Sequence, residues 1–552
     1  MIKDNFVKML EDSIKNNWDL PALSDYKGKT YLYKDVARKI ARIHIMFEEC
    51  NIQPGDKIAL CGKNSANWAM VYLATVTYGA VIVPILADFK TDDIHHIVKH
   101  SDSKVLFVGD PIWENLDESN MSELRAIFSL TDFRLIIQEA HEKIQQIYTK
   151  LDGLYEAKYK GALAPELINY PEVTNDKVAI LNYTSGTSGF SKGVVLPANS
   201  LAVNVKFFSE NLPLKPGDNV VSILPLAHTY GCAFEFLSPF KVGCHINFLT
   251  RTPSPKIIIN AFKEIKPRVV LAVPLILEKI YKNQILPILN KRSMKVLMNV
   301  PLLNNKIFQQ IRNKLVDSFG GNFVEVIIGG AALNAEVEDF LKKIQFPFTV
   351  GYGMTECGPL IAYASHEDHR KYSCGKLMDE YLEIKIDSDD PHNTPGEIIL
   401  KGEQVMYGYY KNEEATKESM DSNGWLHTGD MGVIDEDKFV YIRGRSKNML
   451  LASNGQNVYP EEIEAKINNM PFVQESLVIQ RNDQFVALVY PDYSAADESG
   501  MTKDDLDLIM EENRKNLNEQ LPAYESVKEF QLFPSEFEKT AKRSIKRFLY
   551  TR

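Results

Sequence analysis

The feature that most constrains this chain is a loop rich in glycine and hydroxyl side chains between two apolar runs. Residues 183–193 read Tyr-Thr-Ser-Gly-Thr-Ser-Gly-Phe-Ser-Lys-Gly, with a single lysine, Lys192. The flanking runs, Val178–Leu181 and Val194–Pro197, favour β-strands. Glycine lets backbone N–H groups converge on an anion, and the hydroxyls and the lysine add donors and positive charge. The loop therefore predicts a cradle for a polyphosphate. A flexible linker is the alternative, but a linker has no reason to join two apolar strands.

The loop differs from a Walker A loop, which needs G-x-x-x-x-G-K-[ST] running into a helix. Here Lys192 is followed by Gly193 and then by the second apolar run. The nucleotide would thus be held between two strands rather than at the start of a helix.

Strand-like and helix-like runs alternate on both sides of the loop, which predicts an α/β fold with helices on the faces of its sheets. The expected strands are 56–60, 80–85, 104–108, 220–224 and 269–273, and the expected helices are 68–78, 91–100, 199–211 and 255–264. Residues 110–175 are polar and helical in character. From about Tyr381, short strands with turns, such as 383–386 and 397–400, predict a small β-rich subdomain.

A length of 552 residues exceeds one compact core, so we expect two domains. We place a large N-terminal domain at 1–444 and a small, mobile α+β domain at 445–552. In the latter we expect a helix after Pro460, strands within Val478–Val489 and a helix over Lys503–Asn518.

Charge and cysteine usage exclude several classes of function. The net charge of −10 argues against nucleic-acid binding, because no overall basic field attracts phosphates. The six cysteines are scattered without zinc spacing, which indicates reduced thiols and a cytoplasmic protein. The first twelve residues lack the apolar core of a signal peptide.

Two segments raise the question of membrane contact. The uncharged stretch Trp68–Ala87 is long enough to cross a bilayer, but Gly79 divides it into a helix-like and a β-like half, so we expect a buried helix and strand. Basic residues gather at Lys291–Lys306. A solvated helical face is the favoured interpretation there, and a docking surface for a membrane or an acidic carrier is the alternative.

Later segments supply groups suited to a nucleotide. Val324–Leu333 is a strand ending in Gly-Gly, where a flat base can lie against backbone, and Asn334 is placed to cap the next helix. In Val350–Gly358, Tyr352 can stack on a base and Glu356 offers the hard oxygens that Mg²⁺ prefers. An ordinary strand–helix turn is the alternative for the first segment.

Four more segments follow the same order of motifs as a known family. They are Leu224-Pro-Leu-Ala-His-Thr-Tyr-Gly231, Gly424-Trp-Leu-His-Thr-Gly-Asp430, Tyr441-Ile-Arg-Gly-Arg-Ser-Lys447 and Asn454-Gly-Gln-Asn-Val-Tyr-Pro-Glu-Glu-Ile-Glu464. With the glycine loop, they resemble the adenylate-forming enzymes: acyl-CoA synthetases, adenylation domains and luciferases. The resemblance spans about Tyr31 to Arg547 and is greatest to long-chain fatty acid:CoA ligases.

The resemblance implies a role for each matching residue. Asp430 would bind the ribose hydroxyls, Arg445 the ribose or phosphate, and Thr355 the α-phosphate, while Lys447 would be the hinge between domains. His228 would gate the acyl pocket, whose wall would include the apolar segment 232–240, and Gly455 would line the tunnel for the pantetheine arm of CoA. Thr184 and Glu356 would contact the metal. The implied nucleotide-binding set is Thr184, Ser185, Gly186, Thr187, Ser188, Gly189, Gly330, Ala331, Ala332, Tyr352, Gly353, Met354, Asp430, Arg445, Lys447 and Gly455; the implied catalytic set is Lys192, His228, Thr355, Glu356, Lys542 and Lys546.

The sequence departs from the family near its end. The family has a segment like P-K-T-x-x-G-K-I-x-R that carries a catalytic lysine, but this chain has Arg543 in place of the glycine and Ser544 in place of the lysine. Serine cannot neutralise the charge that builds during attack on phosphorus. Lys542, Lys546 or Arg543 would then substitute, or the step would be slow. If this tail is a strand, Lys542, Ser544 and Lys546 share one face, so a neighbour could replace the lysine; a solvated basic strand is the alternative.

The resemblance implies a two-step reaction with ATP, Mg²⁺ and coenzyme A. A fatty acid, medium to long in chain length, would attack the α-phosphate of ATP, giving acyl-AMP and pyrophosphate. The small domain would then turn about Lys447, and the CoA thiol would take the acyl group. Three alternatives stay open: a fatty acyl-AMP ligase that serves a carrier protein, an adenylating enzyme for aryl or amino acids, and a pseudoenzyme that binds nucleotide or acyl-CoA. Either a monomer or a homodimer fits the sequence.

Overall fold

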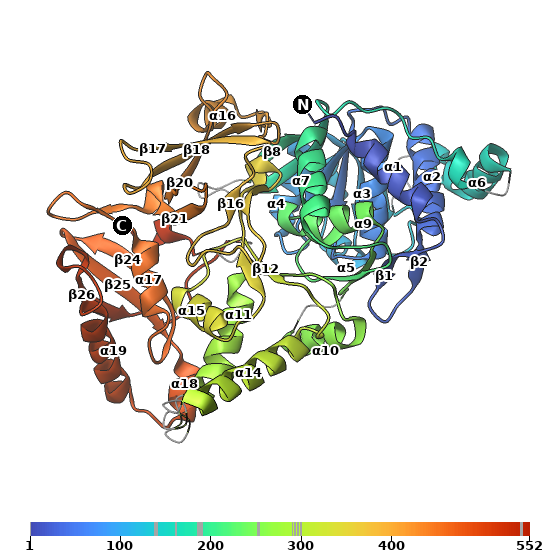
Figure 1. The fold of residues 1–552 in the computed structure, drawn as a ribbon. Helices are drawn as coiled ribbons and strands as arrows, with labels where there is room; N and C mark the ends of the chain where they lie inside the picture. Colours follow the sequence, from blue (N-terminus) through green and yellow to red (C-terminus); the bar gives the residue numbers. More distant parts are fainter. Residues whose placement is uncertain are drawn as a thin grey trace.

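The computed structural model describes residues 2–136, 142–160, 163–184, 191–250, 254–289, 291, 294, 297, 301–540 and 545–551. Its centre is a seven-stranded sheet with the strand order β19-β8-β7-β4-β3-β5-β6 (Figure 1). The strands are β3 (Lys57–Cys61), β4 (Val81–Ile85), β5 (Ser103–Val108), β6 (Ala126–Ser129), β7 (Val178–Thr184), β8 (Lys192–Pro197) and β19 (Gly408–Tyr409). Strands β3 to β7 are parallel, whereas β8 and β19 are antiparallel to their neighbours.

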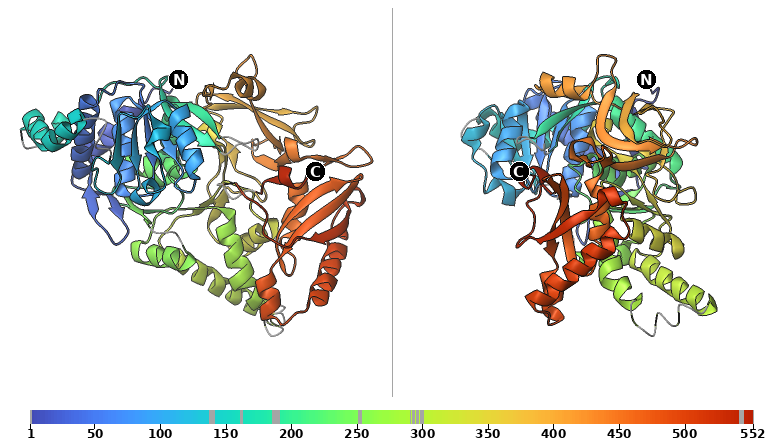
Figure 2. Two further views of the ribbon diagram at one scale, coloured as in Figure 1. Left: turned by 180° about the vertical axis from the view of Figure 1, so that it is seen from behind. Right: turned by 90° about the vertical axis from the view of Figure 1, so that its left-hand side faces the viewer.

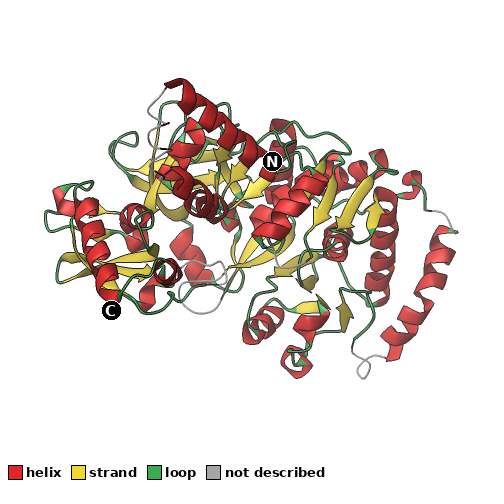
Figure 3. Ribbon diagram, turned by 90° about the horizontal axis from the view of Figure 1, so that it is seen from below, coloured by secondary structure: helices red, strands yellow, loops and turns green. Residues whose placement is uncertain are grey.

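Alternation along the strands gives this sheet two apolar faces. In β3, Ile58 and Leu60 enter one buried cluster, and Ala59 and Cys61 enter another. Because successive side chains of a strand point to opposite faces, helices must cover both sides, as Figure 3 shows. The first cluster also holds residues of α2 (Tyr33–Glu49) and α3 (Ala66–Tyr78), and the second holds α4 (Thr91–His100).

The uncharged stretch 68–87 forms a buried helix and a buried strand, as expected. Ser65 caps α3 by accepting a hydrogen bond from the Trp68 N–H, and Gly79 ends it with a φ of +83°. Strand β4 follows and is buried along its whole length. Within the described part of the chain, no helix is both long and apolar enough to cross a membrane.

Residues 110–175 are not simply polar and helical. They include β6, which pairs in parallel with β5 at the edge of the central sheet. The whole strand Ala126-Ile-Phe-Ser129 is buried, so its short length rather than its polarity hid it in the sequence. The helix α6 (Glu142–Tyr159) follows later in the same region.

Two further sheets complete the α/β part. One has the order β2-β1-β10-β9, and the other is the parallel set β11-β12-β13. Their strands are β1 (Pro21–Asp25), β2 (Thr30–Leu32), β9 (Asn219–Ser222), β10 (His245–Phe248), β11 (Val270–Ala272), β12 (Val326–Ile328) and β13 (Phe348–Val350). The remaining helices of this part are α1 (Phe6–Asn16), α5 (Asp110–Trp113), α7 (Ala198–Asn211), α8 (Thr229–Gly231), α9 (Ser238–Val242), α10 (Pro255–Ile265), α11 (Pro274–Ile280), α12 (Leu286–Leu289), α14 (Pro301–Ser318) and α15 (Ala335–Lys343).

The expected β-rich subdomain is present. A small sheet β14-β15-β16 precedes an antiparallel sheet β17-β18-β20-β21, and the helix α16 (Glu413–Ser419) lies between β19 and β20 in the chain. The strands are β14 (Tyr352–Gly353), β15 (Leu360–Tyr363), β16 (Lys376–Leu377), β17 (Leu382–Asp387), β18 (Gly396–Gly402), β20 (Leu426–Ile434) and β21 (Val440–Arg445).

The chain after β21 forms a smaller α+β domain, drawn in orange and red in Figures 1 and 2. Its sheet β24-β25-β26 packs against α17 and α19. The elements are β22 (Leu450–Leu451), β23 (Asn457–Val458), α17 (Pro460–Ile467), β24 (Val473–Arg481), β25 (Gln484–Pro491), α18 (Tyr493–Glu498), α19 (Lys503–Asn518) and β26 (Val527–Leu532). The division at 444/445 falls at the end of β21 and stays a prediction.

The small domain contacts the larger one through side-chain amides. The Asn334 amide donates to Asn469 Oδ1 at 2.6 Å, and the Asn469 amide donates to Asn334 Oδ1 at 2.8 Å. Asn334 also caps α15, as expected, by accepting from the Glu336 N–H at 2.9 Å. These reciprocal bonds hold α17 and the residues after it beside the start of α15.

Candidate active site

The glycine loop begins and ends at two adjacent positions. Thr184 closes β7, Lys192 opens β8, and the two residues are register partners in the antiparallel pair. The five loop residues predicted to hold phosphate, Ser185, Gly186, Thr187, Ser188 and Gly189, lie outside the described residues. Thr184 and Lys192 therefore lie side by side, at the ends of β7 and β8 that border the loop.

A tyrosine absent from the sequence prediction connects Lys192 to Glu356. The Lys192 ammonium lies 5.1 Å from the centre of the Tyr409 ring. The Tyr409 hydroxyl donates to Glu356 Oε1 at 2.9 Å. Burial first, and then the charge of Glu356, raise the pKa of Tyr409, which keeps its proton as the donor. Strand β19, which carries Tyr409, pairs with β8 and so brings this ring to the glycine loop.

The turn that carries Thr355 and Glu356 is tightly packed. It is a 3₁₀ turn, Thr355–Cys357, in which Thr355 is buried. The Met406 N–H donates to the Glu356 carbonyl at 2.8 Å. A Cβ on the preceding Gly353 would lie 2.4 Å from the Pro359 carbonyl oxygen, so this position needs glycine. Met354 is half-buried against the main core.

Asp430 is the most enclosed acid of the predicted set. It lies on β20, and only 5% of its surface is exposed. The Tyr352 hydroxyl donates to Asp430 Oδ2 at 2.7 Å, and Arg445 Nε pairs with Asp430 Oδ1 at 2.7 Å. Burial raises the pKa of Asp430, the guanidinium of Arg445 opposes this, and the charge of Glu356 raises it further. The charges of Asp430 and Glu356 are thus close enough to interact.

The segment predicted to bind adenine lies beside Tyr352. Ile328 on β12 and Val350 on β13 are partners in a parallel pair. Gly330 and Tyr352 each follow two residues later, so both lie at the carboxyl edge of this sheet, where open α/β sheets bind ligands. Gly330 has a φ of +87°, and Gly330, Ala331 and Ala332 are exposed. The Tyr352 ring is buried apart from 6% of its surface.

The loop that carries His228 is fixed by buried side chains. Glu235 Oε2 accepts from the N–H groups of Ile223 and Leu224 at 3.0 and 2.9 Å. The Asn64 amide donates to the Leu224 carbonyl at 2.6 Å, and the Asn182 amide donates to the Ala227 carbonyl at 2.9 Å.

Glu235 itself is unusual among these groups. It lies in a π-helical stretch, Cys232–Leu237, which is buried throughout. Glu235 Oε1 has no hydrogen-bond partner among the described residues. Burial raises the pKa of Glu235 well above that of an ordinary glutamate, and the hydrogen bonds that it accepts from the Leu224 and Ile223 N–H groups oppose this shift.

The tail is not the single strand expected from sequence. Lys539 and Ile545 form an antiparallel bridge, which a strand running straight from one to the other would not allow. Residues 547–549 form a 3₁₀ turn. Lys546 pairs with Glu538 at 2.6 Å, so its ammonium is already partnered. Lys542, Arg543 and Ser544 lie outside the described residues.

Lys447 and Gly455 lie on the surface of the junction and the small domain. Lys447 is exposed in the 3₁₀ turn Ser446–Asn448, directly after β21. Gly455 is exposed in the turn between β22 and β23, with a φ of +80° and no atom within 4 Å of an added Cβ. Neither residue touches the group around Glu356 and Asp430 through a described hydrogen bond or ion pair.

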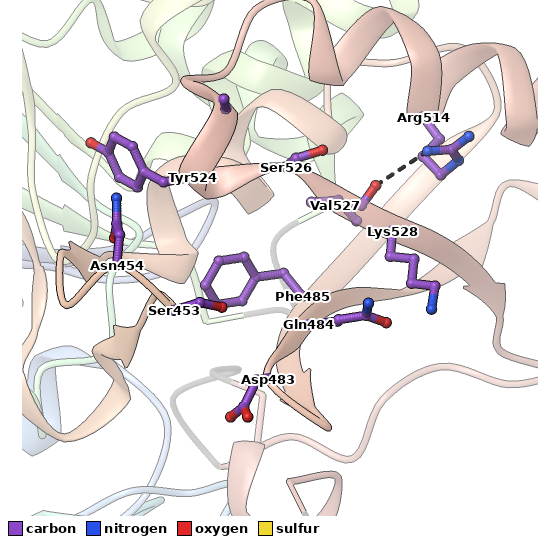
Figure 4. Close-up of a pocket in the computed structure, with 11 residues that line it drawn as sticks. Ser453, Asn454, Asp483, Gln484, Phe485, Arg514, Tyr524, Ser526, Val527 and Lys528 are labelled. Carbon is purple, nitrogen blue, oxygen red and sulfur yellow. Dashed lines mark hydrogen bonds between the residues drawn. The ribbon is translucent and has the colours of Figure 1, made fainter.

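A cavity of about 550 Å³ opens beside the Gly455 turn. Figure 4 shows Asn454 and Tyr524 on one side, Phe485 in the middle, and Lys528 and Arg514 on the other side. Arg514 reaches the same cavity and donates to the Val527 carbonyl at 3.3 Å. Cationic and aromatic groups therefore line this face of the small domain.

Two parts of the chain match known families. Residues 10–410 match the AMP-binding enzyme family, and residues 447–551 match the AMP-binding enzyme C-terminal domain. The chain belongs to the AMP-binding enzyme family. The resemblance seen in its motifs is thereby confirmed, and so is its mixed α/β fold with a smaller C-terminal domain.

Curated relatives within this family include long-chain fatty acid ligases at low identity. The long-chain-fatty-acid–CoA ligase ACSBG2 of Rattus norvegicus is 25% identical over 87% of this chain and 76% of its own. The long-chain-fatty-acid–CoA ligase FadD15 of Mycobacterium bovis is 27% identical over 91% and 86%. A 4-coumarate-CoA ligase of Narcissus pseudonarcissus is 26% identical over 84% of this chain and 79% of its own. The similarity therefore extends to a ligase of another acid. The chain is an AMP-forming acid–CoA ligase by family.

Solved structures share the fold. The anthranilate CoA ligase AuaEII, in complex with anthranoyl-AMP, aligns with a TM-score of 0.78 at 20% identity over 99% of this chain and 96% of that one. The o-succinylbenzoate CoA synthetase MenE of Bacillus subtilis, in complex with ATP and magnesium, aligns with a TM-score of 0.73 at 20% identity over 98% of both chains.

The site offers a fitting set of oxygens for magnesium. Glu356 Oε2 and the Thr184 hydroxyl have no hydrogen-bond partners in the part of the chain that is described, and both are hard oxygen donors. Across the described residues, no cluster of three or more His, Cys, Asp or Glu side chains is set up to hold a metal. A nucleotide-bound Mg²⁺ needs only one or two protein ligands, so this pair is sufficient.

Sequence reasoning missed Tyr409, Glu235, Asn64 and Asn182. Tyr409 lies in Gly-Tyr-Tyr, far along the chain from both groups that it touches, and nothing in its spacing marks it. Glu235 offered a signal: it is a single acid inside an apolar run, and such a residue is buried only with compensating partners.

Proposed function

We propose that this protein activates a medium- to long-chain fatty acid with ATP and transfers it to coenzyme A. The acid would attack the α-phosphorus, breaking its bond to pyrophosphate and forming acyl-AMP. The CoA thiol would then attack the acyl carbonyl and displace AMP. The observation that carries this proposal is the convergence of Lys192, Glu356, Asp430 and Arg445, linked through Tyr409 and Tyr352.

The nucleoside end of ATP would lie along the carboxyl edge of β12 and β13. The exposed Gly330–Ala332 backbone and Tyr352 would hold the adenine, with Gly353 and Met354 below it. Asp430 would accept from the ribose hydroxyls, because its carboxylate is already fixed by Tyr352 and Arg445. A preorganised acceptor binds without first paying the entropy of ordering its side chain.

The phosphate end would lie against the glycine loop. Thr184, Lys192 and the loop residues would hold the pyrophosphate, and Thr355 the α-phosphate. Thr184 and Glu356 would hold magnesium, which when bound offsets the charge of the phosphate oxygens. Reaction at phosphorus needs little more than such positioning and charge stabilisation.

The acyl end would lie near His228. The loop that carries it leads into the buried segment 232–240, which has small and aromatic side chains suited to an apolar tunnel. The long-chain ligases among the relatives, one of them 25% identical to this chain, support a fatty acid as the substrate.

The two half-reactions would use two arrangements of the domains, divided near 444/445. In the observed one, Lys546 chiefly lowers the pKa of Glu538, and the charge of Lys90 in the large domain adds a smaller effect. We assign this arrangement to the first step. Rotation about Lys447 would then bring the Gly455 turn toward the acyl-AMP, and the adjoining cavity with Arg514 and Lys528 would take the charged end of CoA.

Ser544 favours one alternative, a pseudoenzyme that binds nucleotide without turnover. The Lys546 ammonium is already paired with Glu538, so we propose that Lys542 rather than Lys546 supplies the missing charge. A fatty acyl-AMP ligase is the other alternative. A cytoplasmic location, the oligomeric state and membrane contact at 291–306 stay predictions from the sequence.

The test is thioester formation with acids from acetate to oleate, with ATP and Mg²⁺, read by mass spectrometry. We expect acyl-CoA and AMP with medium or long acids. Acyl-AMP that accumulates without CoA stimulation would identify the acyl-AMP ligase. Product only from aryl acids would refute the fatty acid assignment.

A further inference from the structure

Tyr409 occupies the position between the two charged groups predicted to act on the phosphates. Its hydroxyl donates to Glu356 Oε1 at 2.9 Å, and its ring centre lies 5.1 Å from the Lys192 ammonium. The residue is held in turn by its backbone, since its N–H donates to the Thr416 hydroxyl at 2.9 Å. The backbone of Tyr409 is therefore anchored independently of the two groups that its side chain contacts.

The hydroxyl orients one oxygen of Glu356 and leaves the other available. A carboxylate can rotate, and a hydrogen bond to Oε1 restricts this rotation while Oε2 takes no part in the bond. Groups that orient metal-binding carboxylates from behind contribute strongly to metal affinity. Tyr409 has the chemistry of such a group, because its phenol donates a hydrogen bond to the carboxylate.

Lys192 contacts the ring of Tyr409, and Glu356 contacts its hydroxyl. An ion pair between them would neutralise the charges needed for phosphate and for metal, and none is formed in the described structure. The contact of an ammonium with a tyrosine ring is worth about 0.5–1 kcal/mol at an exposed site, so a phosphate can outcompete it. Tyr409 thus holds the lysine in place without neutralising it.

We propose that Tyr409 is the positioning residue of this site: it orients Glu356 for the metal that accompanies ATP and keeps Lys192 free for the phosphates. This inference rests on the proposed function, because it assumes that a metal-bound nucleotide occupies the site. It adds a residue that neither the motifs nor the resemblance assigned.

The chain supplies a matched control in the next residue. The Tyr410 hydroxyl donates to Asp102 Oδ2 at 2.7 Å, so Tyr410→Phe also removes one tyrosine–carboxylate hydrogen bond, but away from Glu356. The full-length wild-type protein, Y409F and Y410F are compared by equilibrium binding of Mn²⁺ with α,β-methylene-ATP, read by electron paramagnetic resonance. This probe reports the site without turnover.

We expect Y409F to bind the Mn²⁺–nucleotide about 10-fold more weakly, and Y410F to bind it like the wild type. In turnover, Y409F raises the Mg²⁺ concentration needed for half-maximal rate and leaves the KM of the acid unchanged. Y409L, which also lacks the ring, loses more affinity than Y409F, because Lys192 can then pair with Glu356.

Equal binding by Y409F and wild type overturns the inference, as does an equal loss in Y409F and Y410F. Neither result affects the proposed function, since the wild type still binds the metal–nucleotide. If the wild type itself binds none, the proposed function fails and the role of Tyr409 fails with it. Melting temperatures of the four proteins show that each variant is folded.

Discussion

At the scale of single residues, the most informative group is the buried carboxyl of Glu235. It accepts two backbone N–H groups in the loop before His228 and has no charged partner among the described residues. A neutral carboxylic acid can accept these two hydrogen bonds, whereas an ionised one would need a cation to offset its desolvation.

This predicts that Glu235→Gln is tolerated and Glu235→Ala is not. Glutamine keeps the accepting oxygen, whereas alanine leaves two buried N–H groups unpaired, at about 1–3 kcal/mol each. Urea unfolding measures the difference, and the KM for fatty acid should rise in E235A but not in E235Q. Equal destabilisation by the two variants would show that Glu235 is ionised.

Single residues also show what a sequence can and cannot reveal. Asp430, Glu356 and Lys192 stand in spaced motifs, so their proximity could be anticipated. Tyr409 contacts a residue 53 positions earlier, and Glu235 acts on backbone groups, so neither is visible without the packing. Side-chain pairing across sheets depends on register, which composition and spacing do not specify.

At the scale of elements, apolar periodicity in the sequence predicted strands and helices. It did not predict the structure of the tail, residues 538–547. The expected helix Lys503–Asn518 is confirmed with its bounds unchanged. The 538–547 segment is short and polar, so its periodicity carries little information, and at its end Arg547 pairs with the buried Glu464 on α17.

That pairing predicts a pH dependence. Burial raises the pKa of Glu464 to about 7, and Arg547 opposes the shift. Because the folded pKa exceeds the unfolded one, the contribution of Glu464 to stability is present at low pH and falls as pH rises toward about 7. The melting temperature of the wild type, relative to that of Glu464→Gln, should therefore fall from pH 5 to pH 8. A pH-independent difference would contradict this.

The turn between β22 and β23 yields a second prediction at this scale. Gly455 has a φ of +80° and open space around it, so Gly455→Val costs about 1–2 kcal/mol of backbone strain without a clash. We expect acyl-AMP formation to continue and thioester formation to slow. Single-turnover assays of each step separate them, and equal loss in both would remove Gly455 from the second step.

At the scale of the whole molecule, hydrogen bonds join the two domains, among them Lys282 to the Val473 carbonyl and the Asn334 amide to the Ala465 carbonyl at 3.1 Å. The reciprocal amide bonds of Asn334 and Asn469 are worth about 0.5–1.5 kcal/mol each, so the arrangement can be changed by modest binding energies. Relative motion is the default expectation for two domains of one chain.

Asn469→Ala should therefore shift the population away from this arrangement by up to about 10-fold. We expect a slower first step and no loss in thioester formation from supplied acyl-AMP. Asn468→Ala is the control, because Asn468 bonds Ser476 within the small domain. A slowed second step in N469A would mean that the observed arrangement serves thioester formation instead.

The central claim is that this chain forms an acyl-adenylate although serine stands at position 544. The most direct measurement is exchange of labelled pyrophosphate into ATP, with and without a long-chain acid, in the absence of CoA. We predict exchange that requires the acid and Mg²⁺ and is lost in Glu356→Gln. No exchange with any acid, in a protein that still binds ATP, would contradict the account and identify a chain that has lost its first step.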